Sequence, residues 1–297
     1  MKLTDLSEIK SLMDRHSVMF KKKYGQNFLI SPTIPERIAD AAVSGMPEGA
    51  RGILEIGPGI GTLTQSLAER ADKVVALEID ESLIPILDET LANFNNVKII
   101  NQDVMKTDLA ELCKTEFGSE FRLSVAANLP YYITTPILMK LVESGVGFDS
   151  ITVMVQKEVA SRLCAAPGTP DYGAITAVLA YYGRCERLFT VPSGCFVPAP
   201  KVDSAVVRLN LYKTPEISVA DPDELFRVIR GAFAQRRKTL SNSLLTEYSS
   251  LGRDIVNDAI RSSGYEPSVR GEALSCADFA RIADYFTAIK AEKSENK

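Results

Sequence analysis

Short β-branched runs that alternate with helical stretches constrain the fold of this 297-residue chain more than any other feature. The runs cover residues 52–56, 74–78, 97–100, 123–127 and 151–155. Helical periodicity recurs between them, at residues 62–70, 81–92 and 135–142. Helices that return the chain in this way connect parallel strands. We therefore predict an α/β fold with a doubly wound sheet.

The regions outside this pattern predict other parts of the molecule. The first 25 residues are polar and show no sustained apolar period, so we expect an arm ahead of the fold. Two later runs, residues 185–191 and 205–212, could pair at the sheet edge. After residue 213 the β signal stops and short amphipathic segments predict a small all-helical domain. The expected parts are an arm (1–25), an α/β domain (26–213) and a helical domain with a charged tail (214–297).

Composition excludes several kinds of chemistry. His16 is the only histidine, so a Ser-His-Asp set and a metal site of clustered imidazoles are both disfavoured, and we expect no metal. The five cysteines include no C-x-x-C pair, which argues against a disulfide framework or a thiolate zinc site and for a reducing compartment. No apolar run approaches the ~18 residues that cross a bilayer. We expect a cytoplasmic protein without a membrane partner.

The strongest local signal is a glycine-rich turn between a strand and a helix, Glu55-Ile56-Gly57-Pro58-Gly59. Open α/β sheets bind ligands at the carboxyl ends of their strands, and glycines let the backbone approach a ligand closely. A dinucleotide fingerprint would need G-x-G-x-x-G, but Thr62 stands where its third glycine belongs. This spacing disfavours a pyrophosphate ligand.

Two carboxylates follow the next strands. Glu78 ends the second run, where it can accept hydrogen bonds from both ribose hydroxyls. Asp103 follows the third run and could accept a hydrogen bond from an adenine amino group. Either residue alone could be only a helix N-cap or a loop end. Together with Gly57 and Gly59 they predict a site for S-adenosylmethionine, and hence a Rossmann-like class I methyltransferase.

The segment Asn128-Leu129-Pro130-Tyr131 follows the fourth run and predicts the reaction. An adenine amine is a poor nucleophile because its lone pair is delocalised into the ring. If the Asn128 side chain and a nearby carbonyl, such as that of Leu129, accept its two N–H bonds, the lone pair turns toward the electrophile. Tyr131 would stack on the base. The alternative is a Pro-Tyr turn packed on the core.

Two later segments could contact the substrate. Phe196 begins a proline-rich loop, and it could either close the other face of the base or anchor the loop in the core. Arg236, Arg237 and Lys238 form a cation cluster on a predicted helix that suits phosphate contacts. Lys21, Lys22 and Lys23 could add to it, although short basic runs are often only solvated surface. Because the net charge is −4, RNA binding would need such a local basic surface.

Six motifs occur in order and carry a resemblance to a known family: Gln26-Asn27-Phe28-Leu29, the glycine turn, Asn128 to Tyr131, Gln156-Lys157-Glu158-Val159, Phe196 to Ser204, and Arg236-Arg237-Lys238-Thr239-Leu240. The chain resembles the rRNA adenine dimethyltransferases of the KsgA type. The resemblance implies N6,N6-dimethylation of two adjacent adenosines in the 3′-terminal hairpin of 16S rRNA, late in assembly of the 30S particle, by a monomer. It also implies cofactor contacts by Asn27, Leu29, Gly57, Glu78, Asp103 and Asn128.

Three other functions are weighed against this one. An erythromycin-resistance type enzyme would share the catalytic half but dimethylate 23S rRNA, and the Phe196 loop and the Arg236 cluster favour the small-subunit target. A ribosome-assembly or transcription factor could keep the fold without the chemistry, which the intact Glu78, Asp103 and Asn128 argue against. A dehydrogenase is disfavoured by the position of the third glycine.

Overall fold

The structure is a computed structural model that describes residues 3–18, 27–235 and 237–295. The chain divides into two compact units. The first contains residues 1–160 and 185–213, and the second contains residues 161–184 and 214–297. The division after residue 213 coincides with the end of the β signal. Residues 161–184, which the sequence places in the α/β domain, belong to the helical unit instead.

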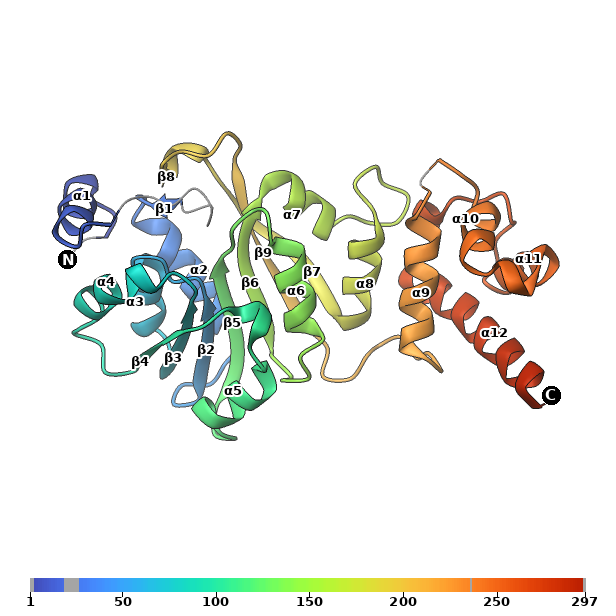
Figure 1. The fold of residues 1–297 in the computed structure, drawn as a ribbon, viewed down its shortest axis with the longest axis horizontal. Coiled ribbons are helices and arrows are strands. Elements are labelled where there is room, and N and C mark those ends of the chain that lie inside the picture. The colour runs from blue at the N-terminus through green and yellow to red at the C-terminus, as the bar shows by residue number, and fades with distance from the viewer. Residues whose placement is uncertain (1–2, 19–26, 236, 296–297) are drawn as a thin grey trace. The chain divides into compact units, whose positions relative to one another are not determined.

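The first unit is built on a seven-stranded sheet in the order β4-β3-β2-β5-β6-β9-β7 (Figure 1). Strands β2 to β6 pair in parallel and β9 runs antiparallel to β6. The strands are β2 (Arg51–Ile56), β3 (Lys73–Glu78), β4 (Val97–Asn101), β5 (Arg122–Asn128), β6 (Ser150–Gln156), β7 (Gly183–Val191) and β9 (Ser204–Leu211). This confirms the doubly wound sheet, with both late runs at its edge.

Helices connect the parallel strands. Their apolar residues recur on one face, and this face packs on the sheet. Ile38 and Leu67 are fully buried in one cluster with Ile53, Val74 and Met154 of the strands. After the N-terminal helix α1 (Leu6–Arg15), the α-helices of this unit are α2 (Thr33–Val43), α3 (Thr62–Ala68), α4 (Ile84–Thr90), α5 (Leu109–Phe117), α6 (Thr134–Val142) and α7 (Lys157–Leu163), whose last residues enter the second unit. A separate two-stranded antiparallel sheet joins β1 (Phe28–Leu29) to β8 (Phe196–Val197).

The N-terminal segment contradicts the expectation of a polar arm, at least over residues 3–18. Residues Leu6–Arg15 form helix α1, which Asp5 caps by accepting hydrogen bonds from two backbone amides. Ile9, Leu12 and Met13 are almost completely buried. Their apolar spacing covers little more than one helical turn, which is too short for sequence periodicity to reveal. Lys21, Lys22 and Lys23 lie outside the described residues.

The second unit is helical around an aromatic core. Tyr172 meets Phe233 edge to face, and Tyr248 stacks on Phe286 with ring centroids 4.2 Å apart. Its helices are α8 (Ala174–Tyr182), α9 (Pro222–Phe233), α10 (Leu240–Glu247), α11 (Arg253–Ser262) and α12 (Cys276–Glu295). None of the helices in the described part of the chain is both long and apolar enough to cross a bilayer.

Candidate active site

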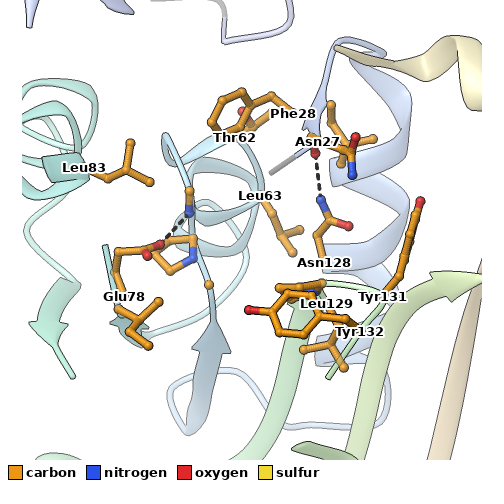
Figure 2. Close-up of a pocket in the computed structure, with 16 residues that line it drawn as sticks. Asn27, Phe28, Thr62, Leu63, Glu78, Leu83, Asn128, Leu129, Tyr131 and Tyr132 are labelled. Carbon is orange, nitrogen blue, oxygen red and sulfur yellow. Dashed lines mark hydrogen bonds between the residues drawn. The ribbon is translucent and has the colours of Figure 1, made fainter. Parts of the chain in front are cut away.

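A pocket lies at the carboxyl end of the sheet, where β2, β3 and β5 end side by side (Figure 2). Ile56 is in register with Leu77 on one side and with Ala127 on the other. The next residue of each strand is therefore Gly57, Glu78 or Asn128, and all three line the pocket. The parallel pairing brings together three residues that are far apart in the sequence, as the sequence predicts.

The glycine turn needs its glycines at this edge. Gly59 has a φ of +63°, a left-handed conformation that side chains disfavour. A Cβ atom on Gly59 would also lie 3.2 Å from Cε1 of Phe28. The backbone here therefore carries no side chain at its glycines, and a ligand in the pocket can approach it closely.

Glu78 holds the turn in place. Its Oε2 accepts a hydrogen bond from the Gly59 amide at 3.2 Å, and its Oε1 accepts one from the Asp80 amide at 2.7 Å. The residue is 4% exposed, and burial raises the pKa of its carboxyl above the usual range. Carboxylate oxygens can each accept more than one hydrogen bond, so this group can still serve a ribose.

Asn128 is oriented by a residue from the other end of the domain. Its Nδ2 donates a hydrogen bond to the backbone carbonyl of Asn27 at 3.2 Å (Figure 2). Leu129 is held by a hydrogen bond from its amide to the carbonyl of Met154. The carbonyl of Pro130 accepts hydrogen bonds from the Ile133 amide and the Thr134 hydroxyl, each at 3.2 Å.

Two adjacent tyrosines stand at the pocket. The Tyr131 hydroxyl lies 2.7 Å from Oγ of Ser204, which is fully buried at the start of β9, and burial raises the pKa of the tyrosine. Tyr132 also lines the pocket and is 64% exposed. Sequence reasoning missed Tyr132, although its position directly after the motif was a usable signal.

Two candidates from the sequence do not line the pocket. Asp103 follows β4 as expected, but its Oδ1 accepts a hydrogen bond from the Met105 amide at 2.9 Å and caps a short 3₁₀ helix. Phe196 is 2% exposed and packs in the main core. It pairs with Leu29 in the small sheet that β8 forms with β1. Of its two predicted roles the structure therefore shows the core one, and the stacking role stays a prediction.

The basic residues of the second unit are also placed differently from the prediction. Arg237 and Lys238 are exposed, but they precede α10 because Thr239 is its N-cap and accepts a hydrogen bond from the Asn242 amide. The predicted helix over this run is therefore wrong for these two residues. Arg236 lies outside the described part of the chain.

Comparison with known proteins identifies the family. A family model described as ribosomal RNA adenine dimethylase matches residues 18–288. The chain belongs to the ribosomal RNA adenine dimethylase family. It is 46% identical over 286 residues to ribosomal RNA small subunit methyltransferase A of Streptococcus thermophilus, covering 96% of this chain and 98% of the relative. The protein of that name from Streptococcus pneumoniae serotype 2 is 45% identical over the same length.

Solved structures of two related enzymes share the fold. A dimethyladenosine transferase from Plasmodium falciparum superposes with a TM-score of 0.73 and 25% identity, covering 88% of this chain and 97% of that one. The 23S rRNA methyltransferase ErmE gives a TM-score of 0.66 and 26% identity, covering 88% of this chain and all of the other. The chain therefore has the class I methyltransferase fold that the sequence predicts.

Membership of the ribosomal RNA adenine dimethylase family establishes the reaction class. The chain is an S-adenosylmethionine-dependent enzyme that dimethylates adenine in ribosomal RNA. The pocket fits this cofactor, because a bare glycine turn lies between the buried carboxylate of Glu78 and the amide of Asn128. The family, the activity and the cofactor inferred from the sequence are thus confirmed, and a dehydrogenase is excluded.

Proposed function

We propose that this chain dimethylates N6 of two adjacent adenosines in the 3′-terminal hairpin of 16S rRNA, within a pre-30S or 30S particle, as a cytoplasmic monomer. Relatives that span nearly the whole chain at 45–46% identity are named for the small subunit, which supports this target. The observation that carries the chemistry is the fixed orientation of the Asn128 amide at the pocket.

The proposed cofactor site uses the glycine turn and its neighbours. Gly57 and Gly59 leave room for S-adenosylmethionine, Glu78 accepts hydrogen bonds from its ribose, and Asn27, Leu29 and Asn128 line the methionine side. Bound S-adenosylmethionine supplies a methyl group that is already activated by its sulfonium sulfur. Asp103 lies outside the lining in this conformation, and its contact with the adenine remains a prediction.

The proposed catalytic step depends on two acceptors for the target amine. Because Nδ2 of Asn128 is committed to Asn27, its Oδ1 is the atom that can accept an N–H of adenine. The carbonyl of Pro130 already accepts two hydrogen bonds, so we assign the second acceptor to Leu129. Two such acceptors localise the lone pair of the amine in the direction of the methyl group.

Tyr131 would hold the extruded base by stacking, which contributes about 1–3 kcal/mol per base. No imidazole is needed for any of these steps. The proposed RNA contacts are made by Arg236, Arg237 and Lys238, with Lys21, Lys22 and Lys23. Guanidinium and ammonium groups in a cluster suit the phosphates of a folded RNA.

The decisive experiment compares methyl transfer to undermethylated 30S particles, free 16S rRNA and 23S rRNA, with the modified nucleotides mapped. We expect four methyl groups on two neighbouring adenosines of 16S rRNA in the particle. The likeness to ErmE makes 23S rRNA the second candidate substrate. Methylation of 23S rRNA alone would assign the chain to that target.

The basic cluster is tested by replacing Arg236, Arg237 and Lys238 together with alanine. Because phosphate contacts release counterions, the variant should bind particles more weakly and lose roughly one unit of salt slope for each phosphate contact removed. A control variant replaces Arg253 and Arg261, two cations on α11 of the same unit, and should keep the salt slope of the wild type. If the salt dependence of binding is unchanged in the triple variant, the three cations do not contact phosphates and are only solvated surface.

A further inference from the structure

Helix α1 forms a small hydrophobic cluster with the walls of the cofactor pocket. It precedes the segment that the family model matches, which begins at residue 18. Nevertheless Leu12 is fully buried and Ile9 is 1% exposed. The buried members of the cluster are Leu3, Ile9, Leu12, Met13, Phe28, Ile60, Leu83 and Ile86. The helix therefore belongs to the packed interior of the first unit.

Two members of this cluster also line the pocket. Phe28 and Leu83 share the cluster with the buried residues of α1, and both contribute to the pocket wall (Figure 2). Phe28 is 6% exposed, and its ring edge lies against Gly59, where an added Cβ would come within 3.2 Å of it. The ring thus lies against the glycine turn and belongs to the same hydrophobic cluster as the buried face of α1.

Polar contacts fix α1 near both of its ends. The Thr62 hydroxyl donates a hydrogen bond to the backbone carbonyl of Leu3 at 3.4 Å, and Thr62 itself lines the pocket. At the other end, Arg15 pairs with Glu89 of α4, and Nε2 of His16 lies 2.6 Å from Oε2 of the same carboxylate. The His16 and Arg15 contacts lower the pKa of Glu89. The helix is therefore held on two elements of the pocket unit, α3 and α4.

We propose that α1 is a positioning element of the cofactor site, which holds Phe28 against the glycine turn and Leu83 in the pocket wall, in the arrangement that binds S-adenosylmethionine. A side chain that is locked by packing before binding does not have to be ordered by the ligand, so affinity rises. The inference rests on the proposed placement of the cofactor in this pocket. It assigns α1 no contact with the target base.

The test compares two full-length variants that differ only in which face of α1 they change. Leu12→Asp places a carboxylate in the cluster, whereas Ser11→Asp places one on the exposed face. Each changes the charge by the same amount. We expect Leu12→Asp to leave about a tenth of the molecules with a pocket that can bind the cofactor. The dissociation constant of S-adenosylhomocysteine, measured by calorimetry, should then rise about tenfold. Ser11→Asp should bind like the wild type.

Steady-state kinetics separates positioning from general damage. Leu12→Asp should raise KM for S-adenosylmethionine, while kcat at saturating cofactor and KM for 30S particles stay near wild type. Leu12→Met, which conserves volume, should restore affinity. Phe117→Leu serves as a destabilised control, because Phe117 is buried beside Gly52 at the opposite end of β2 from the turn. It should lower thermal stability without changing the dissociation constant.

Three outcomes overturn the inference: wild-type affinity in Leu12→Asp, a loss of affinity in Phe117→Leu as large as in Leu12→Asp, or a fall in kcat with unchanged KM for the cofactor. A Glu78→Ala variant measured in parallel shows which idea has failed. If Glu78→Ala loses affinity and Leu12→Asp does not, only the role of α1 is wrong. If neither loses affinity, the cofactor does not occupy this pocket.

Discussion

The side chain of Asn128 donates a hydrogen bond from Nδ2 to the backbone carbonyl of Asn27 at 3.2 Å, across 101 positions of sequence. A carbonyl can only accept, so the contact decides which end of the amide is the nitrogen. The same contact joins the end of β5 to the residue before β1. The N-terminal segment thus orients the group proposed to act on the target amine.

Replacement of Asn128 by alanine should abolish methyl transfer while S-adenosylhomocysteine still binds within a few-fold of wild type. The loss should reach at least about 10²–10³-fold, as for other groups that act through hydrogen bonds in the transition state. Single-turnover transfer to undermethylated 30S particles measures it. Asn128→Asp, which keeps the shape but cannot donate to Asn27, should also be impaired. Near-normal turnover in the alanine variant would refute the assigned role.

Replacement of Glu78 by alanine should weaken cofactor binding. The variant removes the acceptor of the Gly59 amide as well as the proposed ribose contacts, and each hydrogen bond to a charged group contributes about 1.5–3 kcal/mol. We therefore expect the dissociation constant of S-adenosylhomocysteine to rise by roughly tenfold or more. Glu81→Ala is the matched control, because Glu81 is an exposed carboxylate nearby. If both variants bind S-adenosylhomocysteine equally well, Glu78 does not contact the cofactor.

Asp103→Ala tests the one predicted cofactor residue that does not line the pocket. If the carboxylate turns from the Met105 amide to the adenine on binding, the variant loses affinity for S-adenosylhomocysteine but not for S-ribosylhomocysteine, which lacks the base. If Asp103 serves only as a cap, both ligands bind as they do to the wild type. Calorimetry with the two ligands distinguishes these results.

Ser204 and Tyr131 should act as a unit. Tyr131→Phe keeps a ring that can stack but removes the 2.7 Å contact, and Ser204→Ala removes its partner. Each change should cost about 1 kcal/mol in transfer efficiency or stability, and the double variant should cost little more than either single one. Tyr131→Ala should be far more damaging to transfer because the ring is lost. Strictly additive losses in the double variant would show that the two hydroxyls act separately.

Glu55 should make stability depend on pH. It is 1% exposed just before the glycine turn, and burial raises the pKa of its carboxyl to about 8. Between the unfolded value near 4.5 and about 8, the folded chain holds a proton that the unfolded chain has lost. The free energy of unfolding therefore falls as pH rises through this window, by at most about 1.4 kcal/mol per unit.

Glu55→Gln should remove this contribution. The free energy of unfolding of the variant should change less between pH 5 and pH 8 than that of the wild type. Compared with the wild type, the variant should therefore be more stable at pH 8 than it is at pH 5. Urea unfolding at several pH values measures the difference. Parallel curves for the two proteins would show that Glu55 ionises as readily in the fold as in the unfolded chain.

The sequence alone determined the parallel sheet, the glycine turn and the places of Glu78 and Asn128. These features follow from local signals: β-branched runs become strands, and polar residues just after parallel strands meet at one edge. The helical character of residues after 213 was equally local. Recognition of motifs added Asn27 and Leu29, which no pattern of polarity or period indicates.

The tertiary structure decided what depends on contacts between distant segments. It buried Phe196 in the core, joined residues 161–184 to the helical unit, exposed Tyr132 at the pocket and tied Asn128 to Asn27. It also placed α1, whose apolar face is too short to stand out in the sequence, in one hydrophobic cluster with Phe28 and Leu83. Such contacts are selected by the packing of the whole chain, because a side chain is buried only where a distant surface fits it.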